Sequence, residues 1–235
     1  TKIGLDKFGK RKDFSVSKVE KQLYKSLKDL KTDYLDILYF YNPEFNKYEL
    51  EKSYEFIKKM QDKGVINSIG ISFKSPSDID LLNNNIEFEF AQCNFNILDH
   101  RLYKRSIVKY ISKNNVHIIA RTILGLGALT EENYVNNYQF NKNDIRKNWS
   151  TKQINLWKSG IHQIKKFTKN KSSIENIALK YCLSEKLITS CLLGVSNIKE
   201  LKNNLSSNNF VKLENKKIKF IKNLNNKKNF FLKNK

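Results

Sequence analysis

The sequence is poor in the residue types that build disulfide frameworks and metal sites. It has three cysteines and three histidines in 235 residues. Cys93, Cys182 and Cys191 are far apart and lie inside apolar segments, which is typical of buried free thiols in a reducing compartment. No CxxC motif or Cys/His pair has the spacing of metal ligands, and the histidines have no partner at a useful spacing. We therefore expect a cytoplasmic protein that binds no metal.

Long apolar runs are also missing. No run approaches the ~20 apolar residues that a helix needs to span a bilayer. Residues 1–14 lack the apolar centre of a signal peptide. The sequence therefore predicts no membrane association.

Acidic residues are scarce beside basic ones. The chain has 44 Lys and Arg against 23 Asp and Glu, a formal net charge of +21. Such a balance attracts nucleic acid, anionic lipid or phosphorylated small molecules. The lysines are scattered among asparagines, however, which favours a solvated surface. A basic nucleic-acid-binding protein stays the least supported function, because no recognised motif accompanies the charge.

Strand-like and helix-like segments alternate along the chain. Predicted strands cover residues 1–5, 35–41, 65–72, 88–94, 116–122 and 187–194. Predicted helices cover 17–32, 48–63, a short segment after Ser75, 102–114, 151–167, 172–184 and a segment capped by Asn197 and Glu200. Alternation at about thirty residues per unit predicts a parallel sheet with helices outside. Length and apolar content suit one large α/β domain.

Other local signals are more specific. Ser17 and Glu20 predict a capping box for a helix that turns Val19, Leu23, Leu27 and Leu30 to one face. We expect residues 124–149 to form a long loop at the rim of the sheet. The chain after Leu213 should form an amphipathic basic helix followed by a frayed tail. The strand that ends at Ser72 predicts a hydroxyl at the carboxyl rim of the sheet, where α/β folds hold ligands.

Several motifs resemble the aldo-keto reductase family, in the right order. They lie at residues 1–4, 26–36, 70–72, 92–96, 120–129 and 194–204. The resemblance implies a (β/α)8 TIM barrel, whose closed form has eight strands. We expect residues 1–210 to form an N-terminally incomplete barrel with about six strands, lacking the first two, and residues 211–235 to form a basic C-terminal helix and tail. The two open edges of such a sheet predict self-association.

The resemblance also implies a nicotinamide cofactor, NADP or NAD, at the carboxyl rim. Ser72 and Gln92 would hydrogen-bond the nicotinamide carboxamide. Arg121 stands where many members stack a Tyr on the nicotinamide ring, and a guanidinium can stack on a flat ring. The other expected cofactor-binding residues are Leu124 and Gly125 near the pyrophosphate, Ser196, Asn197, Glu200 and Asn204 near the adenosine, and in addition Thr122 and Gly194. Ser196 replaces an Arg or Lys that some members use for a 2′-phosphate, so NADH is as plausible as NADPH.

The catalytic set departs from the family pattern. The family uses an Asp, a Tyr, a Lys and a His, of which Lys2 matches the Lys. The Asp and the Tyr belong to family segments that precede the position of Thr1. Tyr41 stands in the place of the His. Because a Tyr titrates near ~10 rather than ~6.5, it cannot serve as a neutral-pH acid and base in the same way.

Each of these residues has a structural alternative. Lys2 could be a surface lysine near a terminus, and Tyr41 a core aromatic at a strand end. Ser72 and Gln92 could satisfy backbone groups at the rim. Arg121 could pair with a carboxylate such as Asp99.

The leading hypothesis is an NAD(P)H-dependent oxidoreductase that transfers hydride between nicotinamide and the carbonyl of an aldehyde, ketone or sugar-like substrate. The alternative is a catalytically impaired barrel of the same descent that binds nucleotide or a protein partner. Tyr41 is the residue that favours this alternative. The rim loops are too generic to identify the substrate.

Overall fold

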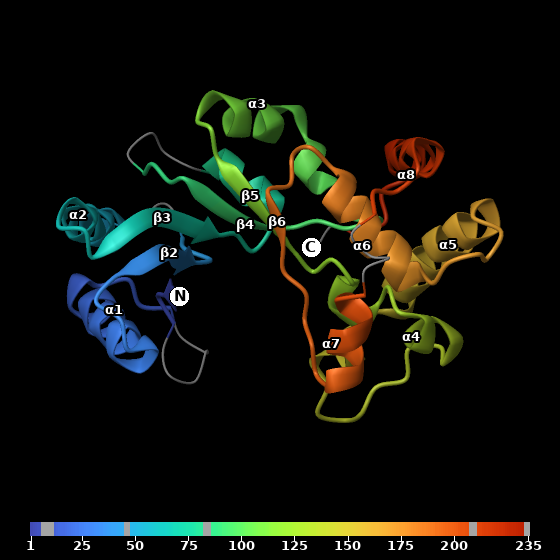
Figure 1. Ribbon diagram of the computed structural model, residues 1–235, viewed down its shortest axis with the longest axis horizontal. Coiled ribbons are helices and arrows are strands. Elements are labelled where there is room, and N and C mark those ends of the chain that lie inside the picture. Colours follow the sequence, from blue (N-terminus) through green and yellow to red (C-terminus); the bar gives the residue numbers. More distant parts are fainter. Residues whose placement is uncertain (6–11, 45–47, 82–85, 207–210, 233–235) are drawn as a thin grey trace. The chain divides into compact units, whose positions relative to one another are not determined.

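The computed structural model describes residues 1–5, 12–44, 48–81, 86–206 and 211–232 (Figure 1). The strands are β1 Lys2–Ile3, β2 Leu35–Tyr41, β3 Ile66–Ser72, β4 Phe90–Asn94, β5 His117–Arg121 and β6 Ser190–Cys191. The α-helices are α1 Val16–Leu30, α2 Tyr48–Asp62, α3 Arg105–Lys113, α4 Glu131–Val135, α5 Thr151–Phe167, α6 Ile174–Ser184, α7 Ile198–Asn204 and α8 Asn215–Lys227. Short 3₁₀ helices lie at Pro76–Leu81, Arg101–Tyr103, Gly125–Gly127 and Ile145–Asn148.

The strands form one sheet in chain order, β1-β2-β3-β4-β5-β6. The pairs β1 with β2, β2 with β3 and β3 with β4 are parallel. Six strands that alternate with helices confirm the predicted α/β architecture and are consistent with a partial (β/α)8 barrel.

Contacts along the chain divide it into two compact units. Unit 1 contains residues 1–93 and 102–119, and unit 2 contains residues 94–101 and 120–235. The division runs through β4 and β5. The expectation that residues 211–235 form a region of their own, apart from the barrel of residues 1–210, stays a prediction.

Unit 1 is built around β2 and β3. Leu38, Tyr39 and Phe40 are buried in succession along β2, and the same holds for residues 69–72 along β3, as expected for strands that are covered on both faces. Helices α1 and α2 lie beside these strands (Figure 1) and bury apolar residues such as Val19 and Ile57. The continuous apolar runs of the two strands therefore account for the core of this unit.

The start and the end of α1 differ from the prediction. The helix begins at Val16, so Ser17 lies inside it and the capping box with Glu20 is wrong. Asp13 instead accepts hydrogen bonds from the backbone N–H and the hydroxyl of Ser15 at 3.0 and 2.7 Å. The predicted inner face also ends early, because Leu30 is 58% exposed.

The last strand is shorter than predicted. The apolar run 187–194 pairs only through Ser190–Cys191 and the adjoining Leu192, whose N–H donates to the carbonyl of Ala120. Because β6 is the last strand in the order, it has a neighbour on one side only. Leu192 is 45% exposed, and the predicted bounds 187–194 were wrong.

The end of the described chain packs on unit 2 rather than fraying. Phe230 is fully buried, and a Cβ on Gly160 of α5 would lie 2.9 Å from its ring. Gln153 of α5 brackets the segment: its Nε2 donates to the carbonyl of Phe230 at 2.7 Å and its Oε1 accepts from the N–H of Leu232 at 2.9 Å. The predicted frayed tail is therefore wrong up to residue 232, and residues 233–235 lie outside the described residues.

The excursion at residues 124–149 contains α4 and two 3₁₀ helices. Arg146 organises it. Its guanidinium donates to Asp144 from Nε and Nη2, donates to the carbonyl of Leu126 at 3.3 Å, and lies 4.4 Å over the ring of Phe140. The segment is therefore an ordered, cross-linked part of unit 2.

Replacing Phe230 with Ala tests the docked end of the chain. We expect a loss of about 3 to 5 kcal/mol in the free energy of unfolding, because a fully buried ring is removed. Urea unfolding followed by tryptophan fluorescence measures it, since Trp149 and Trp157 both lie in unit 2. Leu205→Ala is the control, because Leu205 is 61% exposed; equal stability of the two variants would contradict this packing.

Unit 2 contains a largely buried histidine, His100. Its ring packs against those of Phe95 and Tyr181, at 5.6 and 5.4 Å between centroids, and these two rings also contact each other at 5.9 Å. Burial, and secondly the charge of Lys222, lowers the pKa of His100 to about 3. Lys222 itself pairs with the buried carboxylate of Glu185 at 2.8 Å. A histidine of the unfolded chain titrates near ~6.5, so the unfolded state binds more protons below that pH.

We therefore expect the stability that neutral His100 contributes to be complete above pH 6.5 and to be lost as the pH falls toward 3, a loss on the order of 4 kcal/mol. Urea unfolding at several pH values measures the slope. His100→Phe keeps an aromatic ring and should reduce the slope in this window. Identical slopes for the two proteins would refute the assignment.

Candidate functional site

Five side chains gather on one face of β1 to β4 in unit 1. The register pairs Lys2 with Tyr39 and Tyr39 with Gly70, and two residues further on it pairs Tyr41 with Ser72 and Ser72 with Gln92. Paired residues of parallel strands, and residues two apart in one strand, point to the same face. We call Lys2, Tyr39, Tyr41, Ser72 and Gln92 the rim cluster.

A lysine ammonium and a buried hydroxyl meet in this cluster. The Nζ of Lys2 donates to the Oγ of Ser72 at 3.3 Å and lies 5.2 Å from the ring centroid of Tyr41. Ser72 is 1% exposed, Gln92 is 6% exposed and Tyr41 is half-buried. The structure therefore brings together four residues that the sequence predicted as functional, Lys2, Tyr41, Ser72 and Gln92.

Tyr39 belongs to the same cluster, although it was not predicted as a functional residue from the sequence. It is 5% exposed. Burial raises its pKa above the ordinary value, and the neighbouring Gln92 side chain offsets part of that rise. No hydrogen bond of normal geometry joins the two residues, and within the described part of the chain the Tyr39 hydroxyl and the Gln92 Oε1 have no hydrogen-bond partner. The only sequence signal was a second Tyr two residues before Tyr41.

Arg121 and Thr122 lie in unit 2, where β5 ends. The carbonyl of Arg121 accepts from the N–H of Phe95 at 3.1 Å and from the Thr122 hydroxyl at 2.6 Å. The carbonyl of Thr122 accepts from Asn96 at 3.0 Å and from the N–H of Gly125 at 2.8 Å. The Gly125 amide is therefore already engaged, so a phosphate could bind it only by opening this turn.

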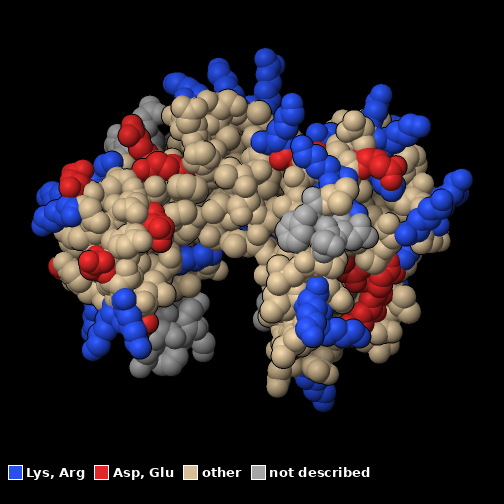
Figure 2. Space-filling model, in the orientation of Figure 1, with Lys and Arg blue, Asp and Glu red and all other residues tan. Residues whose placement is uncertain are grey.

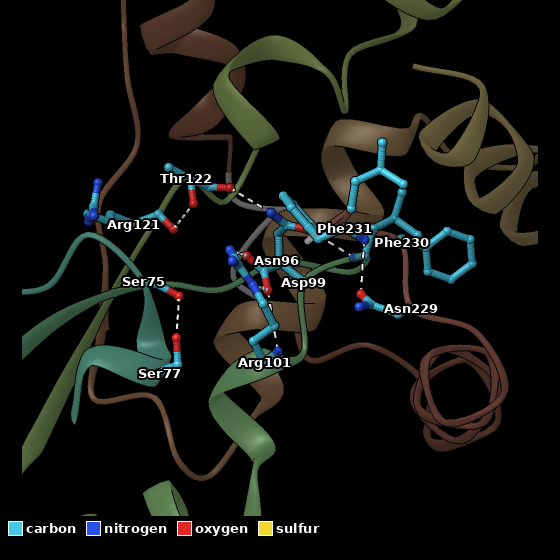
Figure 3. A network of polar contacts seen from close by, with 12 residues as sticks. Ser75, Ser77, Asn96, Asp99, Arg101, Arg121, Thr122, Asn229, Phe230 and Phe231 are labelled. Atoms are coloured by element: carbon cyan, nitrogen blue, oxygen red, sulfur yellow. Dashed lines mark hydrogen bonds and ion pairs between the residues drawn. The ribbon is translucent and has the colours of Figure 1, made fainter. Parts of the chain in front are cut away.

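Asp99 pairs with Arg101. The Nε and Nη2 of Arg101 donate to the two carboxylate oxygens of Asp99 at 2.8 and 2.7 Å, and Asp99 is 1% exposed. The side chain of Arg121 extends away from this pair (Figure 3). The alternative in which Arg121 takes Asp99 as its partner is therefore not what the structure contains.

Four more predicted residues lie where α7 begins and just before it. Asn197 accepts from the N–H of Glu200 at 2.9 Å, which confirms the predicted cap. Glu200 reaches back to the N–H of Ser196 at 2.8 Å and to its hydroxyl at 2.9 Å. The N–H of Ser196 and then its hydroxyl lower the pKa of Glu200, so a charged carboxylate stands here. Gly194 is exposed, and a Cβ added to it would meet no atom within 4 Å.

Asn204 is the last residue of α7. Leu124 lies two residues beyond Thr122 and directly before the Gly125–Gly127 turn. Its carbonyl accepts from the N–H groups of Gly127 and Leu129 at 2.8 and 3.1 Å. All of these residues belong to unit 2.

Other kinds of site find no support in the described residues. There, no three His, Cys, Asp or Glu residues are grouped as metal ligands. Nor does any helix within those residues combine the length and the apolarity that crossing a membrane requires. Lysine and arginine side chains are spread over the visible face, with acidic residues among them (Figure 2), as the interpretation of a solvated surface expects.

Comparisons with known proteins agree on one family. A sequence model of the aldo/keto reductase family matches residues 1–226. L-galactose dehydrogenase from Arabidopsis thaliana is 25% identical over 203 residues, which cover 83% of this chain and 59% of the relative. The aldo-keto reductase YhdN from Bacillus subtilis is 23% identical over 174 residues, 72% of this chain and 52% of the relative. The chain thus spans less than two thirds of the length of these relatives.

Solved structures share the fold. A glycerol dehydrogenase from Gluconobacter oxydans superposes with a TM-score of 0.77 at 20% identity, over 95% of this chain and 70% of that one. The holo form of an aldo-keto reductase from Bacillus halodurans gives a TM-score of 0.70 at 20% identity, over 90% and 68% of the two chains. At this identity the likeness concerns the fold alone.

Proposed function

The chain belongs to the aldo/keto reductase family, and from that premise we propose that it is an NAD(P)H-dependent oxidoreductase. The reaction would be hydride transfer between nicotinamide and the carbonyl carbon of an aldehyde, ketone or sugar-like substrate. The bound cofactor would supply the hydride. The relatives named as dehydrogenases of a sugar and of glycerol support this reaction class.

The observation that carries the proposal is the rim cluster. Gln92 is buried and its Oε1 lacks a partner among the described residues, so it fits a ligand group that donates an N–H, as a carboxamide does. Ser72, beside it in the register, holds its hydroxyl against the Lys2 ammonium and keeps its own proton to donate. Two polar groups at the carboxyl ends of parallel strands are a suitable site for the nicotinamide.

Lys2 and Tyr41 are the proposed catalytic residues. A carbonyl that accepts hydride develops negative charge on its oxygen. Fixed donors stabilise that charge without reorganisation. The Tyr41 hydroxyl would donate a hydrogen bond to this oxygen, and the Lys2 ammonium, 5.2 Å from the Tyr41 ring centroid, would favour the developing charge.

In unit 2 we propose that Arg121 stacks on a flat ring of the cofactor. Thr122 and Leu124 would contact its phosphates, Gly125 would join them once its turn opens, and Gly194, Ser196, Asn197 and Asn204 would contact its adenosine. Glu200 gives a reason to prefer one cofactor. A charged carboxylate accepts hydrogen bonds from a ribose hydroxyl and repels a 2′-phosphate, so NADH is the expected cofactor rather than NADPH.

Titration of the chain with NADH and NADPH, followed by nicotinamide fluorescence, tests the proposal. We expect NADH to bind more tightly than NADPH. Gln92→Ala should raise the Kd of NADH about fivefold, the worth of one hydrogen bond. Gln163→Ala is the matched control, because Gln163 is exposed on α5. Failure of both nucleotides to bind, or equal Kd values for the two variants, would reject the cofactor site.

The alternative function is a barrel that binds nucleotide without turnover, and Tyr41 in the catalytic position is the observation that favours it. Assays of NADH oxidation with aldehydes and ketones separate the two. Oxidation that Lys2→Met abolishes supports the oxidoreductase. Tight binding of NADH with no oxidation across such substrates supports the non-catalytic barrel.

A further inference from the structure

We propose that Tyr39 is a positioning residue that, together with Gln92, fixes a carboxamide group of the ligand in the rim cluster. The inference rests on the proposed function, since the carboxamide is that of the nicotinamide. It adds a residue that neither the motifs nor the comparisons assign.

The Tyr39 ring has room because residue 70, on the neighbouring strand, is a glycine. Tyr39 of β2 pairs with Gly70 of β3, and Gly70 pairs with Phe90 of β4. A Cβ built on Gly70 would lie 2.5 Å from two ring carbons of Tyr39 and 3.1 Å from the carbonyl of Phe90. The Tyr39 ring therefore lies across β3, in space that any other residue at position 70 would fill. Gln92 of β4 lies on the same face, and its side chain lowers the pKa of Tyr39 against the larger effect of burial.

Two complementary polar atoms of the rim cluster lack a hydrogen-bond partner among the described residues. Tyr39 and Gln92 are both more than nine-tenths buried. The Tyr39 hydroxyl and the Gln92 Oε1 have no hydrogen-bond partner in the described residues. Leaving such a group unsatisfied costs about 1 to 3 kcal/mol, so a ligand that pairs with both atoms gains affinity from the site.

The chemistry of the two atoms identifies the ligand group. The Tyr39 hydroxyl can donate, and the Gln92 Oε1 can only accept. A planar carboxamide offers the reverse set, a carbonyl oxygen that accepts and an NH₂ that donates. The Ser72 hydroxyl accepts from Lys2 at 3.3 Å, whereas the Tyr39 hydroxyl and the Gln92 Oε1 have no partner among the described residues.

The environment favours positioning over proton transfer. Burial raises the pKa of Tyr39, which keeps its hydroxyl protonated and able to donate at neutral pH. The Lys2 ammonium contacts Ser72 and Tyr41. Fixing the carboxamide at two points would fix the rotation of the ring that carries it, and orientation of the reacting groups is a large part of catalysis.

The test uses Tyr39→Phe, which removes only the hydroxyl. NADH and ADP-ribose, which shares all of NADH except the nicotinamide, are titrated into the chain by calorimetry. We expect the Kd of NADH to rise about fivefold and the Kd of ADP-ribose to stay unchanged. Tyr54→Phe is the control: it removes another buried hydroxyl of unit 1, one that accepts from the N–H of Glu87 at 3.0 Å, and should change neither Kd.

The possible results distinguish a failure of the proposed function from a failure of the role given to Tyr39. If the natural chain binds neither NADH nor ADP-ribose, the proposed function and the role of Tyr39 both fall. If it binds both but Tyr39→Phe binds NADH as tightly as the natural chain, only the role of Tyr39 falls. An equal loss for NADH and ADP-ribose would mean that the hydroxyl supports the fold, which also overturns the inference.

Gly70→Ala provides a second, independent variant. Its Cβ would displace the Tyr39 ring without removing the hydroxyl. We expect the same selective loss of NADH affinity as in Tyr39→Phe. NADH affinity equal to that of the natural chain in a folded Gly70→Ala protein would contradict the role given to the ring.

Discussion

The parallel pairing of β2 with β3 is the constraint on which the rest of the site depends. It sets Tyr39 beside Gly70 and Tyr41 beside Ser72, and a slip of β3 by one residue would turn Gly70 and Ser72 away from the face that carries the two tyrosines. The buried apolar residues of both strands hold the register, because their alternate side chains fill the core of unit 1. The polar rim cluster is thus positioned by apolar packing.

Much of this architecture could be predicted from local sequence. The bounds of β2 and α5 agree with the prediction, because β2 is an unbroken apolar run and Ser150 caps α5 by accepting from the N–H of Gln153. The predictions were wrong where contacts between segments far apart in the sequence determine the structure. Gln153 holds a tail that lies 77 residues further along the chain, and the exposed β6 lacks a second neighbouring strand. Neither fact is visible in local periodicity.

In the candidate site, too, local contacts could be predicted and contacts between distant residues could not. Lys2 and Ser72 are 70 residues apart, and only the resemblance to a family, not spacing, could group them in advance. Tyr39 could not be found at all, since a tyrosine inside an apolar strand reads as a core residue. Its significance depends on the missing side chain of Gly70 on the neighbouring strand. In unit 2, the cap formed by Asn197 and Glu200 was predictable, because its partners are local in sequence.

The central claim is that a nicotinamide ring lies against the rim cluster. A crystal structure of the chain grown with a reduced nicotinamide nucleotide tests it most directly. The account predicts the carboxamide nitrogen within hydrogen-bonding distance of the Gln92 Oε1 and the carboxamide oxygen within that distance of the Tyr39 hydroxyl. A nucleotide whose nicotinamide contacts neither Gln92 nor Ser72 would contradict the account.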